Sequence, residues 1–109
     1  MNPTLKKQIV KTFIQTLADF KNIKEIETFL NDFWSEEELE TYTKRLAIAY
    51  WLKKGRTSEN IKENLKATLK EIKDVEKDLN SPGIKLAIKK IEAEEWANVW
   101  SEKIKKFVK

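Results

Sequence analysis

The sequence predicts an all-α protein folded as one domain, on three observations. A chain of 109 residues has the usual size of a single domain, so we expect residues 1–109 to form one folded unit. Only two glycines and two prolines occur, which leaves few residues for the tight turns of a β-sandwich or barrel. Charged residues make up 37% of the chain, against about 25% in typical globular proteins, which suits thin helices with a solvated face.

Apolar side chains at helical spacing predict two helices in the first third of the chain. The first spans about residues 4 to 20, with Asn2 as its cap and Pro3 in its first turn. The second begins after Asn22 and ends near Trp34. Asn22 is followed three residues later by Glu25, which is typical of a capping box at a helix start.

A third helix is predicted from Ser35 to Lys54, and it is apolar on every side over residues 46–52. Ser35 and Glu38 form a capping box at its start, and Gly55 supplies a left-handed residue at its end. A chain this thin does not cover all sides of such a helix. We therefore expect a second copy to cover part of it, in a two-fold dimer.

Two short helices follow. One of about eight residues opens at Thr57 or Ser58. The next opens at Thr68, which forms a capping box with Glu71, and its apolar stripe extends to Leu79.

The last helix is predicted over residues 84–109, because Ser81-Pro82-Gly83 ends the helix before it. Two apolar stripes, rotated relative to each other, predict a bend or contacts on two sides. The first stripe holds Ile84, Ile88 and Ile91, and the second holds Trp96, Trp100, Ile104 and Phe107.

The fourth and fifth helices match the spacing of a helix-turn-helix unit over about residues 58–79. Counted from Ser58 as the first of twenty positions, the five positions that pack the two helices together all hold apolar residues: Ile61, Leu65, Ala67, Ile72 and Val75. The ninth position favours glycine because its backbone is left-handed, and it holds Lys66. We expect this departure to cost about 1 kcal/mol or to change the turn.

In this order and spacing, the motifs resemble the Trp repressor family over roughly residues 23–92. The resemblance rests on Trp34-Ser35-Glu36-Glu37-Glu38, Arg45, Leu52-Lys53-Lys54-Gly55 and the helix-turn-helix residues. It implies a Trp repressor-like multi-helix fold in which two subunits intertwine as a homodimer. It also implies a repressor-type transcriptional regulator that binds a palindromic double-stranded DNA operator through one reading head per subunit.

A helical wheel of the fifth helix separates apolar, basic and acidic residues into three stripes. The basic stripe falls at the positions that face the groove in helix-turn-helix units, where lysines contact phosphates or guanine edges. The predicted DNA-binding residues are Arg56, Lys62, Lys66, Thr68, Lys70, Lys73 and Lys77. Asp74 also faces the groove and repels phosphates. In the alternative interpretation, the lysines only solvate the helix and pair with nearby acids, such as Lys70 with Asp74.

The resemblance implies a tryptophan pocket that uses two arginines. Arg45 matches the first, but the second falls on Asp74, whose carboxylate neither stacks on an indole nor pairs with a ligand carboxylate. We therefore expect no tryptophan corepressor and no other cofactor. Ser35 and Arg45 remain ligand-binding candidates, although we favour a helix cap for Ser35 and an ion pair with an acid such as Glu38 for Arg45.

The composition excludes most enzyme chemistry. Without Cys or His, the chain has no thiolate or imidazole for a metal site, a nucleophile or a general base, and it forms no disulfide. Catalysis by carboxylates alone, such as Glu92, Glu94 and Glu95, is disfavoured because adjacent acids on a helix project in different directions. We expect neither an enzyme nor a metal site.

The longest apolar run, residues 46–52, is too short for the roughly 20 residues of a membrane span, and no secretory segment opens the chain. We therefore expect a cytoplasmic protein without a membrane partner. The net charge of +4 does not decide between partners, since residues 55–80 are neutral as a segment. The alternative function is thus a helical dimeric protein-interaction module on the same scaffold, without DNA binding.

Overall fold

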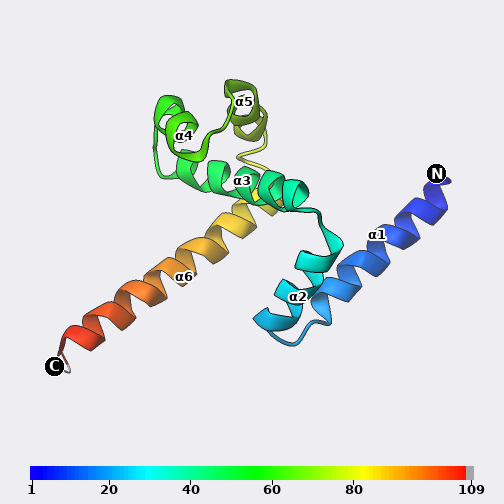
Figure 1. Cartoon of the computed structure of the whole chain (residues 1–109), viewed down its shortest axis with the longest axis horizontal. Coiled ribbons are helices and arrows are strands. Elements are labelled where there is room, and N and C mark those ends of the chain that lie inside the picture. The colour runs from blue at the N-terminus through cyan, green and yellow to red at the C-terminus, as the bar shows by residue number, and fades with distance from the viewer. Residues whose placement is uncertain (108–109) are drawn as a thin grey trace. The chain divides into compact units, whose positions relative to one another are not determined.

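The computed structural model describes the backbone of residues 1–107 and the side chains of residues 1–95. Residues 1–107 contain six α-helices and no strand (Figure 1), which confirms the predicted all-α class. The helices are α1 (Pro3–Ala18), α2 (Ile23–Phe33), α3 (Glu36–Lys53), α4 (Ser58–Leu65), α5 (Leu69–Lys77) and α6 (Pro82–Phe107). The chain divides into two compact units, Met1–Thr41 and Tyr42–Lys109, called here the N-terminal and C-terminal units.

Side-chain caps fix the two helices of the N-terminal unit. The Asn2 side chain accepts hydrogen bonds from the backbone of Thr4 and Leu5, at 2.8 and 3.2 Å. Asn22 caps α2 by accepting from the Glu25 backbone N–H at 2.9 Å. The first helix is two residues shorter at its end than predicted, because the extended backbone at Asn22 requires a short loop before α2.

Four phenylalanines join α1 to α2. The ring of Phe29 lies 6.3 Å from that of Phe13, 5.2 Å from that of Phe20 and 4.9 Å from that of Phe33, between centroids. Yet neither helix buries a single residue. The apolar side chains left exposed in this unit are Met1, Leu5, Ile9, Val10, Ile14, Leu17, Ile23, Ile26 and Phe33. The N-terminal unit therefore has an aromatic seam but no closed core.

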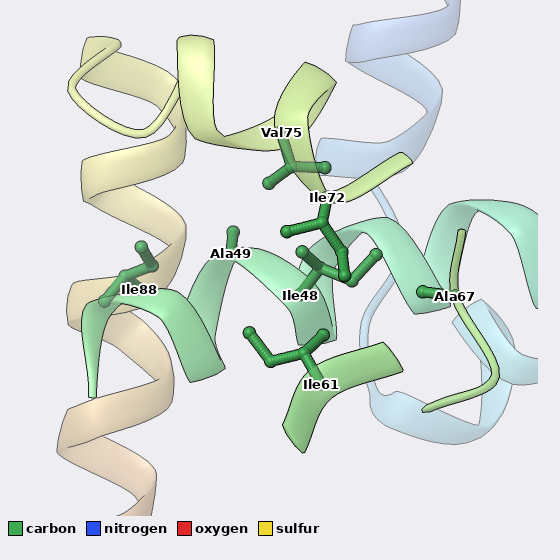
Figure 2. Packing of buried hydrophobic residues seen from close by; sticks show 7 residues of the cluster. All are labelled: Ile48, Ala49, Ile61, Ala67, Ile72, Val75 and Ile88. Carbon is green, nitrogen blue, oxygen red and sulfur yellow. The ribbon is translucent and has the colours of Figure 1, made fainter. Parts of the chain in front are cut away.

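The C-terminal unit has a closed core that four helices and one turn supply (Figure 2). The core residues are Ile48 and Ala49 of α3, Ile61 of α4, Ala67 of the turn, Ile72 and Val75 of α5, and Ile88 of α6. Within the all-apolar stretch of α3, Tyr50, Trp51 and Leu52 are only half-buried and pack at the edge of this core. Burial of Ile48, Ile61 and Ile72 is essentially complete, so these three side chains hold the helix-turn-helix onto α3.

The boundary between α5 and α6 differs from the prediction. The fifth helix ends at Lys77, before Leu79, and Asp78–Asn80 form a turn. Pro82 is the first residue of α6 instead of a terminator, because proline lacks only an N–H that a helix start leaves unpaired. The sixth helix consequently starts two residues earlier than expected, with Gly83 inside its first turn.

The sixth helix runs as one element from Pro82 to Phe107. Its first apolar stripe reaches the core through Ile88, and Ile84 packs against the core. The second stripe, with Trp96, Trp100, Ile104 and Phe107, lies outside the residues whose side chains are described.

Candidate nucleic-acid interface

One cap fixes the start of α4, and a left-handed residue and a second cap define the turn between α4 and α5. Thr57 caps α4 by accepting from the Asn60 backbone at 3.1 Å. Lys66, directly after α4, has φ 54° and ψ 40°, the left-handed conformation predicted for the ninth position. Thr68 then caps α5 in a reciprocal capping box: its hydroxyl accepts from the Glu71 N–H at 3.1 Å, and its own N–H donates to the Glu71 carboxylate at 3.0 Å. The turn therefore keeps the geometry expected at this position despite a lysine where glycine is favoured.

The two sides of α5 differ sharply in burial. Ile72 is 1% exposed and Val75 is 8% exposed, both facing the core with α3 (Figure 2). Lys70, Lys73 and Lys77 are exposed, and we call these three residues the lysine face. The helical wheel thus places the basic stripe correctly on the side away from the core.

Asp74 pairs with a different lysine from the one expected. Its carboxylate lies 4.0 Å from the Lys77 ammonium, one turn later, instead of pairing with Lys70. Both side chains are largely exposed, so the pair adds little to stability. It does reduce the net positive charge at the end of the lysine face.

Arg56 is held in one orientation by two neighbours. Its guanidinium carbon lies 3.9 Å from the centroid of the Trp51 ring, and a guanidinium N–H donates to the Asn60 side chain at 3.2 Å. Lys62, Lys66 and Thr68 are exposed around the turn. All seven residues predicted to bind DNA therefore lie on the C-terminal unit, and all are exposed.

The two ligand-binding candidates fall in different units, Ser35 in the first and Arg45 in the second. Ser35 forms a capping box with Glu38: its hydroxyl accepts from the Glu38 N–H at 3.1 Å, and its N–H donates to the carboxylate at 3.0 Å. The Arg45 guanidinium lies 5.6 Å from the centre of the Tyr42 ring. The helix-cap interpretation of Ser35 is confirmed, and the ion pair of Arg45 with an acid such as Glu38 stays a prediction.

Lys44 was not singled out by the sequence, although it contacts the turn. Its ammonium lies 3.5 Å from the Lys66 carbonyl oxygen and 4.0 Å from the Glu71 carboxylate. Those partners are 22 and 27 residues away along the chain, so no local pattern signals the contact. The pKa of Glu71 is lowered, chiefly by the backbone hydrogen bond from Thr68, with a further contribution from the Lys44 charge.

A second polar cluster joins α3 to α6. The Tyr50 hydroxyl donates to the Glu95 carboxylate, and the Lys54 ammonium lies 3.5 Å from Glu95 and 3.9 Å from Glu92. The bond from Tyr50 lowers the pKa of Glu95, and the Glu95 charge raises the pKa of Lys54. Glu92 and Glu95 therefore join α6 to α3 through Lys54 and Tyr50.

The described residues hold no group of three acids arranged to bind a metal ion. None of their helices is both long and apolar enough to cross a membrane.

Comparison with known proteins gives one match. The family model described as Trp repressor protein matches residues 8–92. No curated protein and no solved structure matches the chain. The matched segment contains α2 to α5 completely, including the capped turn and the lysine face. Because the match covers most of the chain, this protein belongs to the Trp repressor family, which is regulatory and non-enzymatic.

Proposed function

We propose that this protein is a DNA-binding transcriptional regulator of repressor type, with no catalytic step. The observation that carries the proposal is the burial contrast on α5: Ile72 and Val75 fix one side to the core, while the lysine face on the other side is exposed. The second helix of a helix-turn-helix enters the major groove with its exposed side. Lysines there contact phosphates and guanine edges, and the Thr68 hydroxyl retains a proton to donate to a phosphate.

Arg56, Lys62 and Lys66 extend this surface onto the flanking DNA backbone in the proposal. Arg56 is already fixed by the ring of Trp51 and the side chain of Asn60. A guanidinium in a fixed orientation suits bidentate phosphate contact.

The regulator acts as a homodimer on a palindromic operator. The N-terminal unit supports this part of the proposal, because its two helices bury no residue of their own and expose eight large apolar side chains. Exposed apolar area of this kind marks a surface that another protein covers. A second copy doubles the lysine faces and matches the two-fold symmetry of a palindrome.

The decisive experiment is selection from a pool of random duplexes at several salt concentrations. Enrichment of a palindrome with half-sites about one helical turn apart, and an affinity that falls with salt, support the proposal. The charge swap Lys70→Glu with Lys73→Glu should abolish this binding. A matched control is Lys89→Glu with Lys90→Glu, two exposed lysines of α6 with the same change of charge. Equal loss in both variants, or no enriched sequence, contradicts the proposal.

The second candidate function is a protein-interaction module on the same scaffold. The Asp74–Lys77 pair favours it, because a carboxylate on the lysine face repels phosphates. In that case the first charge swap leaves capture of the protein partner largely unchanged, and no duplex is enriched.

We further propose that the regulator does not use tryptophan as a corepressor. Asp74 occupies the position of the second arginine expected from the family, and it carries the charge opposite to the one a ligand carboxylate requires. Calorimetric titration with tryptophan tests this directly. Saturable binding, or operator affinity that rises with tryptophan, overturns it.

A further inference from the structure

We propose that Lys44 is a positioning residue that fixes the turn between α4 and α5, and thereby the direction of the lysine face. The consequence for DNA rests on the proposed function, whereas the consequence for the turn does not. Lys44 lies on α3, outside the helix-turn-helix itself.

The Lys44 side chain is held between α3 and the turn. It is only 18% exposed, which is unusual because lysine side chains are mostly exposed in proteins. Its ammonium reaches the Lys66 carbonyl oxygen at 3.5 Å and the Glu71 carboxylate at 4.0 Å. The two partners lie on either side of the turn, so one side chain connects the end of α4, the start of α5 and α3.

The contact is favourable for both partners. Lys66 takes a left-handed conformation that L-residues disfavour. The last carbonyl groups of a helix accept no hydrogen bond from within the helix. A positive charge near those carbonyls is favourable. In Glu71, one carboxylate oxygen accepts from the Thr68 N–H and the other faces Lys44. Glu71 therefore caps α5 and pairs with α3 at the same time.

The capping box alone fixes where α5 begins, but it does not fix α5 relative to α3. The apolar contacts of Ile72 and Val75 hold α5 to the core, but the hydrophobic effect itself has no direction. A hydrogen bond from a charged group to a carbonyl oxygen is directional, and the Lys44 ammonium donates one to Lys66 in the turn at 3.5 Å. Lys44 supplies that directional contact, and its own charge is used within the protein instead of on DNA.

A double-mutant cycle without DNA tests the contact. Lys44→Met removes the ammonium and keeps the length of the side chain. Glu71→Gln removes the carboxylate charge, and glutamine still serves in a capping box. Each single variant lowers the folding equilibrium constant by some factor. If the pair is formed, the factor for the double variant is smaller than the product of the two single factors, by at least about twofold. Multiplicative losses overturn the proposal.

The cycle is paired with a local readout that a general loss of stability does not move. In Lys44→Met, the backbone amide NMR signals of Lys66 and Thr68 should shift more than those of α6, and Lys44→Arg should restore them. Unchanged turn signals in a folded Lys44→Met protein overturn the proposal. If that variant does not fold, Lys44→Arg and Lys44→Gln replace it, and equal signals in those two overturn it.

Binding to the selected duplex separates positioning from direct contact. Lys44→Met should weaken binding about tenfold with an unchanged slope of log affinity against log salt, because no phosphate contact is lost. Lys73→Met should reduce that slope by about one. A reduced slope in Lys44→Met shows that Lys44 touches phosphate and is not a positioning residue. If the wild-type protein binds no duplex, the proposed function fails, while the cycle and the NMR signals still decide the role of Lys44 in the turn.

Discussion

Both units of this chain form capped helices, but they differ in how many residues they bury. In both, asparagine or threonine side chains cap two helices. Among the residues with described side chains, the C-terminal unit closes seven into a core, whereas α1 and α2 of the N-terminal unit bury none. Capping is a property of a few neighbouring residues, and burial requires elements that surround one another. We therefore expect the C-terminal unit to be stable as a single chain and the N-terminal unit to depend on contacts beyond those between its own two helices.

The largest effect should come from the core of the C-terminal unit. Ile61→Ala should lower the free energy of unfolding by about 2–5 kcal/mol, because it removes a fully buried side chain and leaves a cavity. The matched change Ile23→Ala, at a side chain that is 80% exposed, should cost about 0.5 kcal/mol or less. Urea unfolding at low protein concentration measures both. Similar losses at the two sites contradict the contrast between the units.

The next prediction concerns what covers the N-terminal unit. Ile14 of α1 is 58% exposed in the single chain. If a second copy covers it, Ile14→Asp should raise the dissociation constant of the dimer at least about 100-fold, because an unpaired carboxylate is costly to bury. Sedimentation over a range of concentrations gives this constant.

The control for this prediction is Gln8→Asp, on the polar side of the same helix. It introduces the same carboxylate and should leave the dimer intact. A monomeric wild-type protein, or dissociation in both variants, excludes α1 as the dimer surface.

Removing one helix cap in each unit tests whether the two units unfold together. Thr68→Ala in the C-terminal unit and Asn22→Ala in the N-terminal unit each remove one capping side chain. Each should cost about 1 kcal/mol where its helix unfolds with the rest of the protein. At concentrations that favour a monomer, Asn22→Ala should lose its effect on global unfolding and Thr68→Ala should keep it. Equal effects at all concentrations would mean that the N-terminal unit is stable without a partner.

Lys66→Gly tests the one unfavourable backbone conformation found among the described non-glycine residues. Glycine adopts the left-handed region without a steric cost, so the change should raise stability by up to about 1 kcal/mol. Loss of the side chain should also reduce the salt dependence of DNA binding if Lys66 touches phosphate. Thermal unfolding checks the first result, and a decrease in stability would show that the lysine side chain has a contact of its own.

The smallest predicted effect depends on pH. The pKa of Glu71 is lowered from 4.5, so its contribution to stability is present above about pH 4.5 and is lost as the pH falls through the lower value in the folded protein. Because the side chain is 40% exposed, we expect about 0.5 kcal/mol or less. Unfolding free energy measured from pH 6 to pH 3 should fall less steeply in Glu71→Gln than in the wild-type protein. Glu76→Gln, on the same helix, serves as the control.

Local signals explain most of what could be predicted from the sequence. Thr68 and Glu71 lie three residues apart, and their reciprocal bonds follow from that spacing alone. The left-handed backbone of Lys66 follows in the same way from its place in the helix-turn-helix pattern. Exposure of the lysine face was predictable because a helix turns by a constant angle per residue.

Contacts between distant residues explain what could not be predicted. Tyr50 and Glu95 are 45 residues apart, and their bond depends on how α6 crosses α3. The contacts of Lys44 with the turn depend on tertiary packing in the same way. The choice of Lys77 over Lys70 by Asp74 is a matter of side-chain conformation, since both spacings are allowed on a helix. The early start of α6 was missed because proline at the first position of a helix resembles proline after the last.

Stacking of Arg56 on Trp51 has a consequence for the thermodynamics of any complex it forms. A long cationic side chain on a surface normally loses rotamer entropy when a ligand immobilises it. The Arg56 guanidinium is already restricted by an aromatic plane and an amide, so it has less of that entropy to lose than the lysines of α5. Its contribution to binding should therefore be more enthalpic than theirs, and the indole beneath it provides an intrinsic fluorescent reporter of the same event.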